Sequence, residues 1–99
     1  MNNLENKIIC SSAALKRKLE MFIVNCPSHQ HDDFFEISCA GGKLTIGDYS
    51  MDVEAKREWV RSFDFKKIKE IKRLLKRIPE QPLVIEFGDG NIEILNVQV

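Results

Sequence analysis

The chain has 99 residues, enough for one domain with a hydrophobic core and too few for several. Its 43% apolar content is that of a globular protein, and 15 basic and 15 acidic side chains give a net charge of zero, which excludes a uniformly basic nucleic-acid-binding protein. The start MNNLENK lacks the apolar core of a signal peptide, and no apolar run approaches the roughly 20 residues of a membrane span. We therefore expect one cytoplasmic domain over residues 1–99.

The first predicted elements are a short strand, KIIC, and a helix that begins after Ser11 or Ser12. Cys26 and Pro27 end this helix. Apolar side chains recur on one face of it at spacings of three and four, and Arg17 points outward. The predicted buried face consists of Leu15, Leu19, Phe22 and Ile23.

Two strands, FFEISCA and GGKLTIG, follow the polar loop PSHQHDD. Apolar and polar residues alternate in the first of them, as in a half-buried strand. Gly41 and Gly42 supply the positive φ of the hairpin turn. The next segment, DYSMDVEAKRE, is predicted to hold one further strand around Ser50 to Ala55 that connects the two halves of the chain.

The second half repeats this order with the strand WVRSF, the helix DFKKIKEIKRLLKRI and the strands PLVIEF and GDGNIEILNV. Asp64 is the predicted N-cap of the helix, and Pro79 and Pro82 stop it. One apolar stripe of the helix should lie on a sheet. This stripe consists of Ile68, Ile71, Leu74, Leu75 and Ile78.

The repeat predicts the fold. The units span about 7–47 and 59–97. The spacing from the first strand to the hairpin glycine is similar in both, with 34 residues from Ile8 to Gly42 and 30 from Val60 to Gly90. We therefore predict an α+β domain, with two helices packed on one face of a single antiparallel sheet of about seven strands. The two strand-helix-hairpin units should be related by a pseudo-twofold axis.

The charges are unevenly distributed, because ten of the basic residues fall in the two predicted helices, where only Glu20 and Glu70 oppose them. In the second helix Lys66, Lys69 and Arg73 project from the side opposite the apolar stripe, together with two further cations. The acids lie mainly in strands and loops, so we expect an electrically two-faced molecule. A solvated surface that only aids solubility is the alternative reading of this basic face.

Two stretches resemble the DNA sliding clamps, whose domains are built from two strand-helix-strand-strand-strand units with paired helices on one face. They are SSAALKRKLEMF with FFEISCAGGKLTIGD, and SFDFKKIKEIKRLLKRIPEQPLVIEFGDGNIEI. The similarity is to one domain of the bacterial DNA polymerase III beta subunit and covers nearly the whole chain.

This resemblance implies phosphate contacts from helix cations that do not read sequence, and no cofactor. The implied DNA-phosphate-binding residues are Arg17, Lys66, Lys69, Lys72, Arg73, Lys76 and Arg77. A clustered cationic face on an otherwise acidic body is also what non-specific DNA binding requires. The family places six such domains in a ring around DNA, so a chain with one domain would form a homo-oligomer or act differently.

Other groupings carry weaker signals. The loop HQHDD, from His29 to Asp33, offers possible metal ligands, but we interpret it as a polar loop because a third defined ligand is missing. Asp89 lies in a glycine-rich turn between strands, not in a phosphate loop. Cys10 with a histidine has no recognisable catalytic setting, so an enzyme is not expected. The aromatic residues Trp59, Phe63 and Phe65 are predicted to pack in the core rather than stack on bases.

The three cysteines, Cys10, Cys26 and Cys39, have no CxxC spacing and lie in or beside apolar stretches, which predicts reduced, buried thiols. The leading hypothesis is a non-enzymatic clamp-like domain that holds duplex DNA, or that acts with replication or repair proteins. The alternative is a small protein-interaction or regulatory module that uses acidic strands and open sheet edges without DNA binding.

Overall fold

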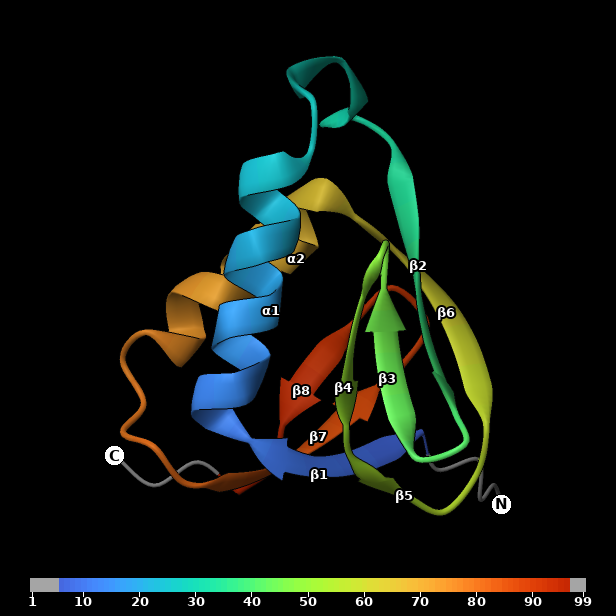
Figure 1. Cartoon of the computed structure of the whole chain (residues 1–99), viewed down its shortest axis with the longest axis vertical. Helices are drawn as coiled ribbons and strands as arrows, with labels where there is room; N and C mark the ends of the chain where they lie inside the picture. Colours follow the sequence, from blue (N-terminus) through green and yellow to red (C-terminus); the bar gives the residue numbers. More distant parts are fainter. Residues whose placement is uncertain (1–5, 97–99) are drawn as a thin grey trace.

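The computed structural model describes residues 6–96 (Figure 1). Val97, where the second predicted unit ends, lies outside the described residues. In chain order the first elements are β1 (Lys7–Ser11), α1 (Ser12–Asn25), the 3-10 turn η1 (Ser28–Gln30), β2 (Phe34–Ala40), β3 (Lys43–Ile46) and β4 (Tyr49–Asp52). They are followed by β5 (Glu54–Ala55), β6 (Trp59–Asp64), α2 (Phe65–Leu75), β7 (Pro82–Phe87) and β8 (Ile92–Ile94).

The described residues form two four-stranded antiparallel sheets, so the prediction of a single sheet was wrong. One sheet, here the β1 sheet, has the order β5-β1-β7-β8, and the other, the β2 sheet, has the order β4-β3-β2-β6. The two sheets meet through aromatic side chains. Phe87 of β7 stacks on Trp59 of β6 at 4.7 Å between ring centroids and meets Phe63 edge-on at 6.1 Å.

The first strand of each predicted unit lies in a sheet with strands of the other unit. β1 pairs along its whole length with β7, from Lys7 opposite Glu86 to Ser11 opposite Pro82. β6 pairs in the same antiparallel manner with β2, from Phe34 opposite Asp64 to Cys39 opposite Trp59. The two halves of the chain are therefore interlocked, and neither sheet can form from one half alone.

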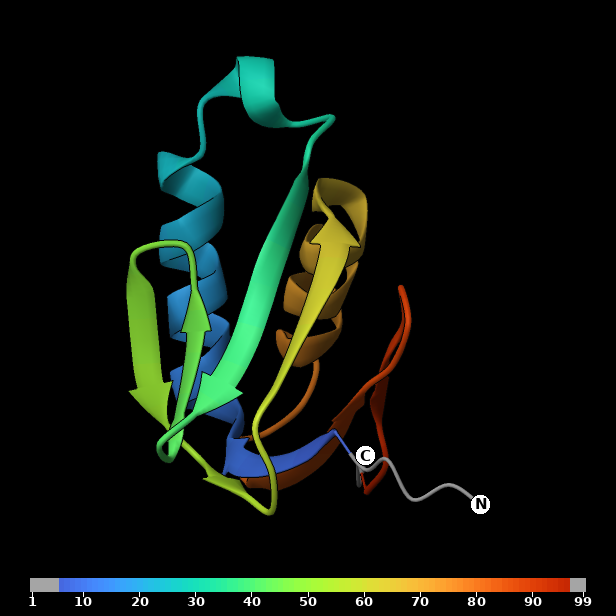
Figure 2. The same ribbon diagram turned by 90° about the vertical axis from the view of Figure 1, so that its right-hand side faces the viewer.

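The helices begin as predicted. The hydroxyl of Ser11 accepts a hydrogen bond from the Ala14 amide at 3.2 Å, and the carboxylate of Asp64 accepts one from the Lys67 amide at 2.8 Å. Figure 2 shows α1 beside the β3–β4 hairpin and α2 on the other side of α1. The N-terminal end of α1 lies near the C-terminal end of α2, because Ser12 and Leu75 line the same small hollow.

The core lies between the two sheets and the two helices. Leu15, Leu19 and Phe22 of α1 are buried as predicted, and Ile23 is half-buried. The core also contains the predicted aromatic residues Trp59, Phe63 and Phe65, the thiols of Cys10 and Cys39, and Ile68, Ile71 and Leu75 of α2. Cys26, also predicted to be buried, is only half-buried because it follows the last residue of α1. Leu74 is 43% exposed, which contradicts its place in the predicted stripe. Its six-residue offset turns it about 120° away from Ile68 around the helix.

The segment between the units holds two strands where one was predicted. β4 forms a hairpin with β3, and after Val53 the chain enters β5, which pairs with Ile8 and Ile9 of β1. The segment therefore contributes an edge strand to each sheet. In the part of the chain described, neither helix has the length and apolar character needed to cross a membrane.

Candidate nucleic-acid interface

The candidate interface is the outward side of α2 and of the turn that follows it. Four of the predicted phosphate-binding residues are exposed there, and two, Lys69 and Lys72, are half-buried. The exposed four are Lys66, Arg73, Lys76 and Arg77. Lys76 and Arg77 follow the last helical residue, and their amides still bond to carbonyls of the last helical turn. The predicted helix extended to Ile78, so the prediction that Lys76 and Arg77 lie in the helix was wrong, because the helix ends at Leu75.

The N-terminal half of this face is built on a buried aromatic ring. Phe65 is 3% exposed, and the imidazole of His31 stacks on its ring with 4.1 Å between centroids and 13° between planes. The ammonium of Lys69 lies 5.5 Å from the same ring, within the range of a cation–π contact. His31 is held from behind by a 3.1 Å hydrogen bond between Nε2 and the Cys26 carbonyl. The stack fixes the position of one cation of the face.

The face is hollowed around this stack. The hollow measures about 430 Å³ and is lined by His31, Phe65, Asp32 and helix residues of both signs. The helix residues are Lys66, Lys69, Glu70 and Arg73. Glu70 forms a 3.2 Å ion pair with Lys67, which is not part of the lining. Among the described ion pairs, the two lysines of the lining, Lys66 and Lys69, have no carboxylate partner.

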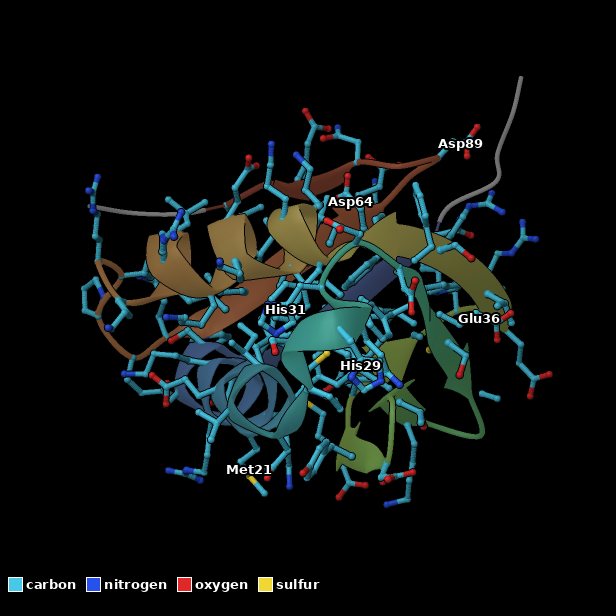
Figure 3. The ribbon with its side chains drawn as sticks, turned by 90° about the horizontal axis from the view of Figure 1, so that it is seen from above. Met21, His29, His31, Glu36, Asp64 and Asp89 are labelled. Atoms are coloured by element: carbon cyan, nitrogen blue, oxygen red, sulfur yellow. The ribbon has the colours of Figure 1, made fainter. Side chains whose placement is uncertain are left out.

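Arg17, the remaining predicted contact, is exposed on α1, away from the other six. Its neighbours on the outward side of α1 are apolar, because Met21 is 38% and Val24 is 80% exposed. Figure 3 shows Met21 directed away from α2. The predicted contacts are thus concentrated on α2 and the turn after it, and Arg17 is the one predicted contact on α1, between half-buried Lys16 and Lys18.

The acids occupy the strands and turns. Glu36 and Asp89 are exposed and lie on the strand side of the molecule, away from α1 (Figure 3). Asp52 is paired with Lys43 at 2.6 Å across the β3–β4 hairpin, and this contact lowers the pKa of the Asp52 carboxyl. Such an exposed pair contributes little to stability.

The histidine loop forms a structural contact. His31 stacks on Phe65, whereas His29 is exposed, and within residues 6–96 no group of three or more metal-binding side chains comes together. Burial, and to a smaller degree the charge of Glu80, raises the pKa of the Cys10 thiol to about 12, which makes this thiol a poor nucleophile.

Sequence reasoning missed the His31–Phe65–Lys69 stack and a second contact, the cap of α1 by Glu80. The Glu80 carboxylate accepts hydrogen bonds from the Ala13 amide at 2.7 Å and from the hydroxyls of Ser11 and Ser12 at 2.8 and 3.0 Å. These bonds lower the pKa of Glu80, with the Ala13 amide as the largest cause. Neither contact has a local signal, because its members lie far apart in the sequence.

Comparison of the chain with protein-family models, with curated proteins and with solved structures finds no match.

Proposed function

We propose that this protein is a non-enzymatic, clamp-like domain that binds duplex DNA without sequence specificity through the basic face of α2. The proposal treats the two strand-helix-hairpin units as pseudo-symmetric copies. The strand order supports this, because the first strand of each unit pairs with the hairpin of the other unit: β1 lies beside β7 and β8, and β6 lies beside β2 and β3. Each unit then contributes one helix to the same side of the domain.

The observation that carries the proposal is the run of exposed cations on α2. Lys66 and Arg73 project from the helix side opposite buried Ile68, over about 10 Å of helix rise, and exposed Lys76 and Arg77 follow in the turn after the helix. Duplex DNA carries one negative charge per roughly 1.7 Å of its axis, so a face of this length meets several phosphates. Contacts of this kind position a protein on DNA without reading bases.

A single domain could surround DNA only as a closed oligomer, so the proposal includes self-association or assembly with replication or repair proteins. Light scattering at low and moderate salt, with and without a short duplex, distinguishes these forms. A mass of several chains, or a mass increase with DNA that salt abolishes, supports the proposal. A monomer whose mass is indifferent to DNA contradicts it.

The decisive test compares two double variants with the same change in charge. Arg73→Glu with Lys76→Glu removes two cations from the basic face, and Lys56→Glu with Arg57→Glu removes two exposed cations from the loop after β5. Binding to a duplex is measured by fluorescence anisotropy between about 50 and about 200 mM salt. We expect the first variant to bind every sequence more weakly, with the slope of log K against log salt reduced by about 1.8. Equal losses in both variants would show that net charge, not this face, is responsible.

One observation favours the alternative function, a protein-interaction module. β6 is an edge strand of the β2 sheet, and its Val60 is 52% exposed. Such an edge can accept a strand from another protein. Binding of that kind would persist at high salt and need no nucleic acid, which separates it from the DNA proposal.

A further inference from the structure

A second surface feature lies at the C-terminal end of α1, a hollow lined by residues of this helix, the β3–β4 turn and the start of β2. Its volume is about 290 Å³, room for one large side chain. Three aromatic residues, Phe22, Phe35 and Tyr49, form much of its lining. No residue lines both this hollow and the one on the basic face, although Phe22 and Phe35 contact Phe65, the ring beneath the basic face.

The aromatic walls are held in fixed positions. The rings of Phe22 and Phe35 meet edge to face, with 5.1 Å between centroids and 80° between planes. The hydroxyl of Tyr49 accepts a 2.8 Å hydrogen bond from the side-chain amide of Asn25. Gly47 passes directly over Phe22, and a Cβ at this position would come within 2.9 Å of the ring. A hollow with fixed walls loses little conformational entropy on binding.

The surroundings of the hollow are acidic and have no counter-charge. Asp48 lies in the lining, and Asp33 is close enough to Cys26, another lining residue, to act on its thiol. Burial, followed by the charge of Asp33, raises the pKa of this thiol. Within residues 6–96 the ion pairs involve other acids, so both carboxylates remain unneutralised. An occupant with a positive charge next to its apolar group would complement this arrangement.

Exposed apolar side chains continue the surface beside the hollow. Val24 is 80% and Met21 38% exposed on the last turns of α1, and Asn25, which bonds to the Met21 carbonyl, belongs to the lining. These two side chains add apolar surface near the hollow that a bound segment could cover.

We propose that this hollow binds a short segment of a partner protein, with one aromatic side chain packed against the aromatic lining formed by Phe22, Phe35 and Tyr49 and a flanking lysine or arginine against Asp48. Edge-to-face contacts favour an aromatic occupant over an aliphatic one of equal size. The volume admits one ring, not two. The proposed site does not depend on the proposed DNA binding, since none of the proposed phosphate-binding residues lines this hollow.

The test uses the full-length ¹⁵N-labelled protein and blocked synthetic peptides. The pentapeptide GKFKG should shift the amide signals of Asn25, Gly47 and Tyr49 with a dissociation constant on the order of 1 mM. The peptides GKAKG and GEFEG, which lack the ring or reverse the charges, should bind more weakly. Equal binding of GEFEG, or shifts elsewhere on the protein, would overturn the proposal.

Two protein variants sharpen the result. Asp48→Lys should weaken GKFKG binding about two- to fivefold, as expected for one exposed charge pair, and Asp89→Lys, in the exposed β7–β8 turn, should not. The signals of the hollow are also followed on dilution of the free protein. If they change with protein concentration, a second copy of the chain fills the hollow and the proposed partner is wrong.

Discussion

Two consecutive isoleucines of β1 provide the sharpest test of the interlocked fold. Ile8 is 0% exposed and lies opposite Ala55 and Ile85, whereas Ile9 is 42% exposed on the outer face of the same sheet. Replacing either with alanine removes three carbon atoms. At about 0.8 kcal/mol per buried CH₂, Ile8→Ala loses about 2.4 kcal/mol of transfer free energy, and the cavity adds roughly 1–2 kcal/mol. We expect a total of about 4 kcal/mol for Ile8→Ala and about 1.5 kcal/mol for Ile9→Ala, which leaves no closed cavity.

Urea unfolding measures this difference, followed by far-UV circular dichroism and by the fluorescence of Trp59. With a slope of about 1.2 kcal/mol per M for a chain of this size, the unfolding midpoint should fall by roughly 3 M for Ile8→Ala and roughly 1 M for Ile9→Ala. Both probes should give one transition, because β1 and β6 are each paired with strands of the other half. If Ile8→Ala is too unstable to study, Ile8→Val should still lower the free energy of unfolding by about 1 kcal/mol. A similar loss in both alanine variants, or a Trp59 signal unaffected by Ile8→Ala, would refute the interlocked arrangement.

Two further predictions concern ionisable groups. The folded-state pKa of Glu80 is lowered from its ordinary value of 4.5, so its stabilising contribution is present above that value and is lost as the pH falls through the lowered pKa. In thermal melts, acidification from about pH 6 to about pH 3 should therefore destabilise the Glu80→Gln variant less than the native chain. The same pH dependence in both proteins would contradict the cap. In thiol labelling of the native protein followed by mass spectrometry, half-exposed Cys26 should react before buried Cys10 and Cys39, which should need unfolding. Labelling of Cys10 at the rate of Cys26 would contradict its burial.

The candidate site could be predicted in part. The basic face of α2 follows from helical geometry, since the positions of Lys66 and Arg73 relative to Ile68 depend only on 100° per residue. The aromatic stack beneath it could not be predicted, because His31 and Phe65 are separated by a long stretch of chain and meet only when β2 pairs with β6. The hollow beside α1 is equally non-local, since its rings come from a helix, a strand and a hairpin.

The sequence by itself determined the order and type of the two helices and of the strands within each unit, because these depend on neighbouring residues. The caps at Ser11 and Asp64, the alternation in β2 and the turn glycines all act within a few positions of the chain. Only the tertiary structure decided that the strands form two sheets and that β1 and β6 each pair with a strand of the other unit. Strand pairing depends on which inner faces can pack together, and here the contact of Phe87 with Trp59 and Phe63 joins the two sheets into one core.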